Sequence, residues 1–158
     1  MKPYFENDQH WQQFFEILQS WIGTRYRHFT GVKGRGADCT LFIAQSLIEL
    51  GVLEKITYDY YPKDWHLNHK RELIKEYISK NVKHLVGGLK IVQTDDTWMR
   101  GDLVLFCMNK LGVSNHASIV IDEKSIMGAV ACRGVAIMEI NNYWRRHVTY
   151  LYRLMEES

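Results

Sequence analysis

The spacing of apolar residues changes in the middle of the chain, and this change constrains the fold more than any other feature. Before Gly87-Gly88, apolar side chains recur every three or four residues, which is typical of helices packed on a core. Beyond it they alternate with polar residues or form short runs, which is typical of strands. Helices first and strands afterwards predict an α+β domain, with N-terminal helices packed on an antiparallel sheet formed by the C-terminal half.

Three segments of the first half have helical spacing. Asn7 or Asp8 can cap the first, and Gly23 can end it. Asp38 can cap the second, residues 40–50, which is apolar on nearly every side and so belongs in the middle of the core. A third helix follows a tyrosine-rich stretch. The core-facing positions of the first and third segments are predicted to be Trp11, Phe14, Phe15, Leu18, Ile22, Leu67, Leu73, Ile74, Tyr77 and Ile78.

The second half contains six candidate strands, separated by Gly, Asn and Asp turns. They cover residues 89–93, 102–108, 116–122, 125–130, 134–140 and 148–154. Between the first two helices, residues 24–37 are rich in glycine and basic side chains and have no periodicity. That segment is predicted to be a loop, long enough to be functional.

Length and charge exclude several classes of protein. A chain of 158 residues fits one domain, residues 1–158, and its net charge of +2 gives no reason to expect a nucleic-acid partner. No stretch is apolar enough to predict a membrane span, and the N-terminus lacks the pattern of a secretory signal, so synthesis into the cytoplasm is expected. Cys39, Cys107 and Cys132 form no disulfide pattern and are predicted to be free thiols.

Cys39 follows the glycine-rich loop and begins the central helix. A free thiol has a pKa of about 8.5, and a helix N-terminus or a nearby imidazolium can lower it enough to give a reactive thiolate. The N–H groups of the first helical turn can also stabilise a developing oxyanion. The alternative is that Cys39 packs as a small buried hydrophobic residue, as most buried cysteines do.

A catalytic cysteine needs a base within hydrogen-bond reach, and His116 is the best placed histidine. It opens the candidate strand 116–122, where its ring can face a helix N-terminus packed on the sheet. His28, in the glycine-rich loop, is the main rival. His66 and His69 form an HxxH pair without a third ligand, so no zinc or other metal is predicted.

Two blocks of the sequence together resemble the NlpC/P60 cysteine peptidases, which have a papain-like fold. They are "GTRYRHFTGVKGRGADCTLFIAQSLIELG" and "RGDLVLFCMNKLGVSNHASIVID". The segments "YYPKDWHLNH" and "YWRRHVTYLYR" are similar to phage-associated and prophage-encoded members. The resemblance runs from about Trp21 to the C-terminus. It implies that Cys39 is the nucleophile, that His116 is its base, and that Tyr26 lies beside the oxyanion site. Asp38 is interpreted as a helix cap rather than a participant in the chemistry.

The chain departs from the family pattern at one position. Members usually carry a third polar residue, often histidine, that orients the catalytic imidazole from the next strand. Here the matching position is Gly128, or Met127 if the register slips by one residue. The orienting role then passes to a water, a backbone carbonyl, Glu139 or Asn115.

The function implied by the resemblance is hydrolysis of peptide bonds in the stem peptides of bacterial peptidoglycan, by a Cys-His mechanism without a cofactor. One alternative is a weakly active or inactive structural or binding module, such as a phage tail component carried in the virion. Another is a thiol acyltransferase or an amidase acting on a substrate outside the cell wall. Tyr58, Tyr60, Tyr61 and Trp65 either wall a substrate groove or serve as core and rim. No membrane partner is expected.

Overall fold

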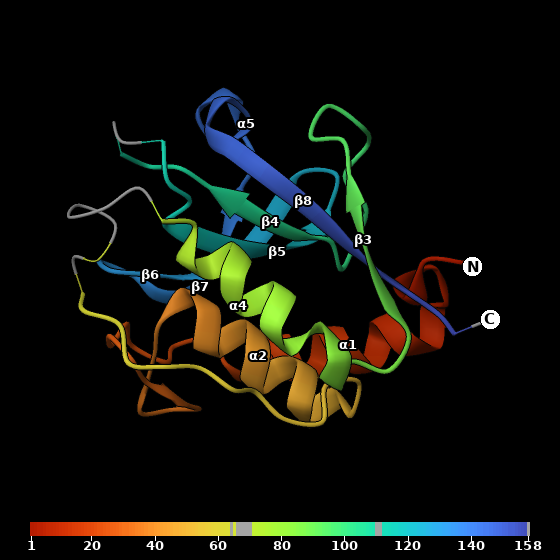
Figure 1. Ribbon diagram of the computed structural model, residues 1–158, viewed down its shortest axis with the longest axis horizontal. Helices are drawn as coiled ribbons and strands as arrows, with labels where there is room; N and C mark the ends of the chain where they lie inside the picture. The colour runs from red at the N-terminus through yellow and green to blue at the C-terminus, as the bar shows by residue number, and fades with distance from the viewer. Residues whose placement is uncertain (64, 66–70, 110–111, 158) are drawn as a thin grey trace.

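An antiparallel six-stranded sheet forms the C-terminal half of the computed structural model, which describes residues 1–63, 65, 71–109 and 112–157 (Figure 1). Its strand order is β3-β8-β4-β5-β6-β7. The strands lie close to the ranges predicted from periodicity: β3 (Gly88–Val92), β4 (Leu103–Phe106), β5 (His116–Asp122), β6 (Ser125–Val130), β7 (Gly134–Glu139) and β8 (Val148–Met155).

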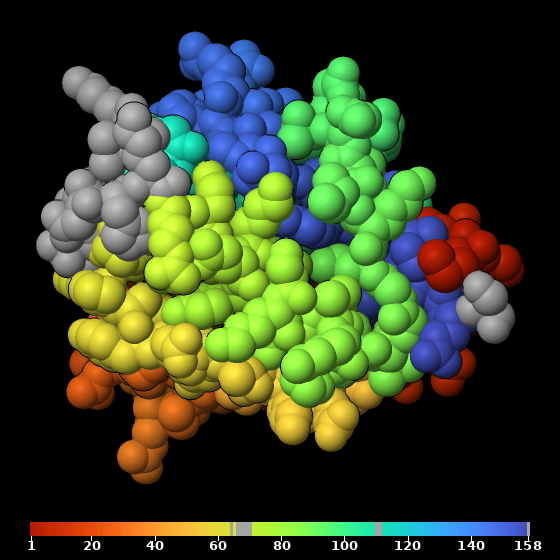
Figure 2. Space-filling view, in the orientation of Figure 1, coloured from red at the N-terminus to blue at the C-terminus, as the bar shows by residue number. Residues whose placement is uncertain are grey.

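The helices pack on one face of this sheet, as predicted (Figure 1). They are α1 (Asp8–Ser20), α2 (Cys39–Leu50) and α4 (Leu73–Asn81), with short 3₁₀ turns at Tyr4–Glu6 and Val82–His84. Because α2 is apolar on nearly every side, it occupies the middle of this layer, and Phe42 on it is fully buried. In Figure 2, α4 covers the middle of the visible face. The architecture is therefore the predicted α+β arrangement.

The helix ends follow the capping residues in the sequence. Asn7 caps α1 by accepting from two backbone N–H groups, and Gly51 ends α2 with a left-handed φ of 88°. The first helix stops at Ser20, earlier than predicted. Trp21 then takes the buried position, and Ile22, predicted to face the core, is 50% exposed in the following turn. Leu67 lies outside the described residues.

The second face of the sheet is also covered. Trp98 and the short helix α5 (Asn142–His147), which carries Trp144, pack on a second apolar cluster there. The sequence analysis did not predict α5, nor the small hairpin β1 (Gly31–Val32) and β2 (Gly36–Ala37) inside the glycine-rich loop. Strands β4, β5 and β6 are consequently buried on both faces.

The Gly101-Asp102 pair of the second sequence block has a structural role. Asp102 is 1% exposed, and its two carboxylate oxygens accept from Nε and Nη2 of Arg153 at 2.8 Å each. One of these oxygens also accepts from the N–H of Met99 at 2.8 Å. Removing one partner from such a buried pair typically costs about 3–5 kcal/mol of stability. Asp102 thus attaches the turn that precedes β4 to Arg153 of strand β8.

Within the described residues, the helices are all too short or too polar to span a bilayer.

Candidate active site at the start of the central helix

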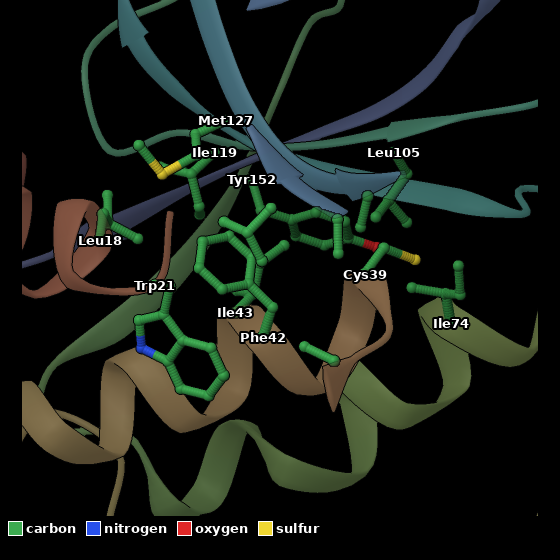
Figure 3. Packing of buried hydrophobic residues seen from close by; sticks show 14 of the residues in the cluster. Leu18, Trp21, Cys39, Phe42, Ile43, Ile74, Leu105, Ile119, Met127 and Tyr152 are labelled. Carbon is green, nitrogen blue, oxygen red and sulfur yellow. The ribbon is translucent and has the colours of Figure 1, made fainter. Parts of the chain in front are cut away.

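Cys39 is the first residue of α2 and is 8% exposed. Figure 3 shows it at the end of the helix, with Leu105 of β4 and Ile74 of α4 around it. The backbone N–H groups of Thr40 and Ala117 lie where they can donate to its sulfur. Since Ala117 directly follows His116, the thiol lies against the first residues of β5.

Asp38 connects three parts of the chain at this point. As the N-cap of α2, it accepts from the N–H of Leu41 at 2.8 Å. Its other oxygen accepts from the N–H of Phe29 at 3.0 Å and from the hydroxyl of Tyr61. Burial raises the pKa of this carboxyl, and the hydrogen bonds from Tyr61 and the two N–H groups oppose that rise. The capping interpretation is confirmed, and the same carboxylate fixes the loop and the tyrosine-rich segment around the helix start.

A small pocket of about 60 Å³ opens beside Cys39 and Asp38. Of the four aromatic residues considered from the sequence, Tyr61 and Trp65 line this pocket and are buried. Tyr60 is 69% exposed, and Tyr58 packs against the main core. Part of the tyrosine-rich stretch therefore walls the pocket, while the remainder forms rim and core.

Tyr26 also lines this pocket. Burial, and then the nearby Cys39 and Asp38, raise the pKa of its hydroxyl to about 12. The hydroxyl consequently keeps its proton at any physiological pH. It is available as a hydrogen-bond donor toward a negative charge forming beside Cys39.

The electrostatics of the resting thiol differ from the sequence expectation. Burial is the largest effect on Cys39 and the Asp38 carboxylate the second, and together they raise its pKa to about 12. The N–H groups of Thr40 and Ala117 favour the thiolate but do not compensate. The resting Cys39 is therefore a protonated thiol and not the expected thiolate. The cost of removing a charged sulfur from water is larger than the stabilisation that the N–H groups at the helix N-terminus provide.

His116 is the first residue of β5, and its ring lies on the sheet face that carries Phe106, its cross-strand partner. The ring centroid is 6.0 Å from that of Phe106 and 5.7 Å from that of Trp144. Burial lowers the pKa of His116 to about 4, so the imidazole is neutral at physiological pH. Within the described residues, no hydrogen bond joins this ring to the sulfur of Cys39.

His28 lines the pocket together with Cys39. Its Nε2 lies 2.7 Å from the carbonyl oxygen of Tyr61. A carbonyl only accepts, so Nε2 carries the proton and the lone pair is on Nδ1. Of the two histidines weighed from the sequence, His28 therefore lines the pocket with Cys39, whereas the ring of His116 lies with Phe106 and Trp144 on the face of the sheet opposite the helix layer.

The side chain that contacts the His116 ring by a hydrogen bond is Ser118, with 3.0 Å between Nε2 and Oγ. The sequence analysis had considered other candidates. Glu139 is exposed and pairs with Ser125 at the opposite end of β6 from Gly128, and Asn115 accepts from the N–H of Met108 at 2.8 Å. One signal for Ser118 was present in the sequence, because residues two apart on a strand share a face.

Among the described residues, no group of three or more His, Cys, Asp or Glu side chains could hold a metal ion. His66 and His69 lie outside those residues. The three cysteines, all described, are free thiols, with Cys39 buried, Cys107 partly buried and Cys132 exposed.

The raised pKa of Cys39 predicts slow alkylation of the free protein. At neutral pH, iodoacetamide should label the exposed Cys132 first and leave Cys39 unmodified, because the reacting species is the thiolate. Labelling of each cysteine can be followed from pH 6 to 10 by peptide mapping. Cys132 serves as the internal control, and faster labelling of Cys39 at pH 7 would contradict a protonated resting thiol.

Comparison with known structures agrees with the fold. An NLP/P60 family protein of Staphylococcus aureus subsp. aureus Mu50, described as similar to lipoprotein, matches 96% of the chain at 15% identity with a TM-score of 0.59. The chain spans only 43% of that protein. The NlpC/p60 domain of the peptidoglycan hydrolase SagA matches over 89% of the chain and 96% of its own length, at 13% identity and a TM-score of 0.54.

The peptidoglycan hydrolase RipB of Mycobacterium tuberculosis matches 99% of the chain and 69% of its own length, at 15% identity and a TM-score of 0.58. These likenesses confirm the NlpC/P60 fold predicted from the sequence. No curated protein matches the chain. A family model does match, over residues 7–152, and its description is "Putative amidase domain". Because this match covers nearly the whole chain, the protein belongs to that amidase-domain family.

Proposed function

We propose that the protein is a thiol-dependent amide hydrolase that cleaves peptide bonds in bacterial peptidoglycan stem peptides. One observation carries the proposal. Cys39 lies at the first turn of α2, in the wall of a pocket that Tyr26 and His28 also line. These are a nucleophile, an oxyanion donor and a base.

In the proposed reaction, a histidine base takes the proton from the Cys39 thiol as the sulfur attacks the amide carbonyl carbon. The family resemblance assigns this role to His116, and His28 is the histidine that lines the pocket. A C–S bond forms, and the carbonyl oxygen becomes an oxyanion that receives hydrogen bonds from the first turn of α2 and from Tyr26. The C–N bond then breaks, and the imidazolium returns its proton to the leaving amine. Water attacks the resulting thioester with the same histidine again accepting a proton, which releases the carboxylic acid and restores the thiol.

The resting pKa values suit a transfer that accompanies attack. The Cys39 thiol and the His116 imidazole are both neutral in the free protein, because burial disfavours the thiolate and the imidazolium alike. The proton therefore moves when a substrate carbonyl is present to accept the sulfur's electron pair. A protonated, buried thiol also limits adventitious oxidation of the cysteine, because the thiolate is the reactive form.

The substrate class is proposed from family and fold. The family is one of amidase domains, and two structural neighbours are described as peptidoglycan hydrolases. The test is digestion of purified sacculi followed by mass spectrometry of the released muropeptides, with Cys39→Ala protein as the matched blank. We expect stem peptides with a new amine and a new carboxylate in the wild-type digest only. Identical muropeptides in both digests would overturn the proposal.

A second candidate is a binding module that retains the fold without turnover. The protonated thiol and the absence, within the described residues, of a hydrogen bond between Cys39 and His116 favour it. Such a module would sediment with sacculi equally well as wild type and as Cys39→Ala, and would release no product. Digests containing an added amine distinguish a third outcome, acyl transfer, by products that carry that amine.

A further inference from the structure

A second cavity, of about 100 Å³, lies between helices α2 and α4 and the sheet. Residues three or four apart line it, from Thr40 to Leu47 on α2 and from Ile74 to Asn81 on α4. Each of these stripes follows about two turns of its helix, or roughly 10 Å, so the cavity is elongated. Most of the lining side chains are aliphatic, and those of the described residues in its wall are all uncharged.

One hydroxyl in the wall of this cavity is left without a partner. Tyr152 of β8 lines the cavity and is 4% exposed, and Figure 3 shows its side chain between the sheet and α2. Within the part of the chain that the structure describes, its hydroxyl makes no hydrogen bond. Thr40, Tyr77 and Asn81 also bring polar groups to the wall, but each of them is hydrogen-bonded to another residue. A buried polar group without a partner indicates a place for a water or a ligand.

An apolar chain suits this wall better than water does. A buried water needs about two to four polar partners, and the cavity offers it one free group. By contrast, an engineered cavity of about 150 Å³ with an apolar lining stays dry and binds benzene. Because the present cavity is elongated, it favours an unbranched chain over a ring.

The Tyr152 hydroxyl favours an uncharged polar end on that chain. Burial, and then Tyr150 and the Glu72 carboxylate, raise the pKa of Tyr152 to about 12, so the hydroxyl keeps its proton and can donate it. The same carboxylate disfavours an anion beside the hydroxyl, and an anion also costs more to remove from water than a neutral group does. The group that meets Tyr152 is therefore a neutral acceptor.

We infer that this cavity is a binding site for a small neutral amphiphile, with a short unbranched alkyl chain between α2, α4 and the sheet and one oxygen that accepts from the Tyr152 hydroxyl. The site is distinct from the pocket of Cys39, although Thr40, Ile74 and Tyr77 line both. The inference does not depend on the proposed hydrolysis, since binding involves no covalent step.

The probe for this site is 1-hexanol, which has such a chain, one oxygen and no amide. In wild type with labelled isoleucine methyl groups, NMR should show saturable shifts at Ile43 and Ile78, which line the cavity, and none at Ile126 in the cluster on the other face of the sheet. Hexanoate, with the same chain and a negative charge, should bind about 10-fold more weakly or worse. A lack of saturable shifts with 1-hexanol, or equal or tighter binding of hexanoate, would overturn the inference.

Tyr152→Phe tests the hydroxyl itself. It should lower the affinity for 1-hexanol about 3- to 10-fold, as expected for the loss of one hydrogen bond. The Tm of the ligand-free variant should be no lower than that of wild type, because the hydroxyl that is removed has no partner among the described residues. Tyr150→Phe is the matched control and should bind as wild type does, since Tyr150 lies two residues away on β8 and does not line the cavity. Unchanged affinity in Tyr152→Phe, or a lower Tm without ligand, would show that the hydroxyl does not hold the ligand.

Discussion

Replacing His116 with alanine is expected to lower kcat/KM for peptide-bond cleavage by about 10²- to 10⁴-fold, the usual contribution of a general acid–base residue. The reason is specific to this site. With a thiol pKa of about 12, almost no thiolate forms unless a base removes the proton during attack. Burial keeps His116, the base that the family resemblance assigns, unprotonated down to about pH 4 and hence over the whole physiological range.

His28→Ala is the matched control for this prediction, because His28 lines the same pocket as Cys39. Its Nε2 is hydrogen-bonded to the carbonyl of Tyr61, so we expect its loss mainly to loosen the tyrosine-rich segment and raise KM. Steady-state kinetics of both variants, with circular dichroism to confirm folding, provide the comparison. A larger loss of kcat in His28→Ala than in His116→Ala would identify His28 as the base.

Replacing Cys39 with alanine is expected to abolish cleavage, with a loss of more than about 10⁴-fold, since Cys39 supplies the only thiol among the described residues that line the pocket. Cys39→Ser should be nearly as inactive, because a hydroxyl gives up its proton less readily than a thiol. The wild-type enzyme, quenched during turnover, should show by intact-mass spectrometry a species heavier by the acyl group. That species should be absent from Cys39→Ala.

Cys132→Ala is the control for the loss of a thiol, since Cys132 is exposed and lies outside the pocket. It should retain wild-type activity and acyl-enzyme formation. If Cys39→Ala keeps more than a tenth of the activity, the nucleophile is another group or an activated water. The assignment of Cys39 would then fail, even if peptidoglycan proved to be the substrate.

Local chemistry made much of the fold predictable. Asp38 and Gly51 lie at the two ends of α2. The Asp38 carboxylate accepts from a free N–H group at the helix start, and glycine tolerates the left-handed φ of 88° at the helix end. Strand β6 has the range predicted from its apolar run. Short elements were missed because they carry little periodic signal. The six residues of α5 are too few to show a stripe, and their burial depends on Trp144 finding a sheet face formed elsewhere.

The candidate site was predictable in its members but not in its electrostatics. The position of Cys39 at a helix start was evident from the sequence, whereas the degree of burial, which decides its pKa, depends on how α4 and β4 close around it. Ser118 was missed for a related reason. The hydroxyl of Ser118 lies beside Gly128. That closeness depends on the register between β5 and β6, which a single sequence does not specify.

The shared volume at positions 118 and 128 has an evolutionary consequence. A side chain at 128 and a hydroxyl at 118 exclude each other, because their atoms would be 2.6 Å apart. A lineage that adds a side chain at 128 while it keeps the serine therefore passes through a clash. The two positions should substitute together across relatives, with glycine alternating between the strands. Serine with glycine, in that order, would then mark the branch of the fold to which this chain belongs.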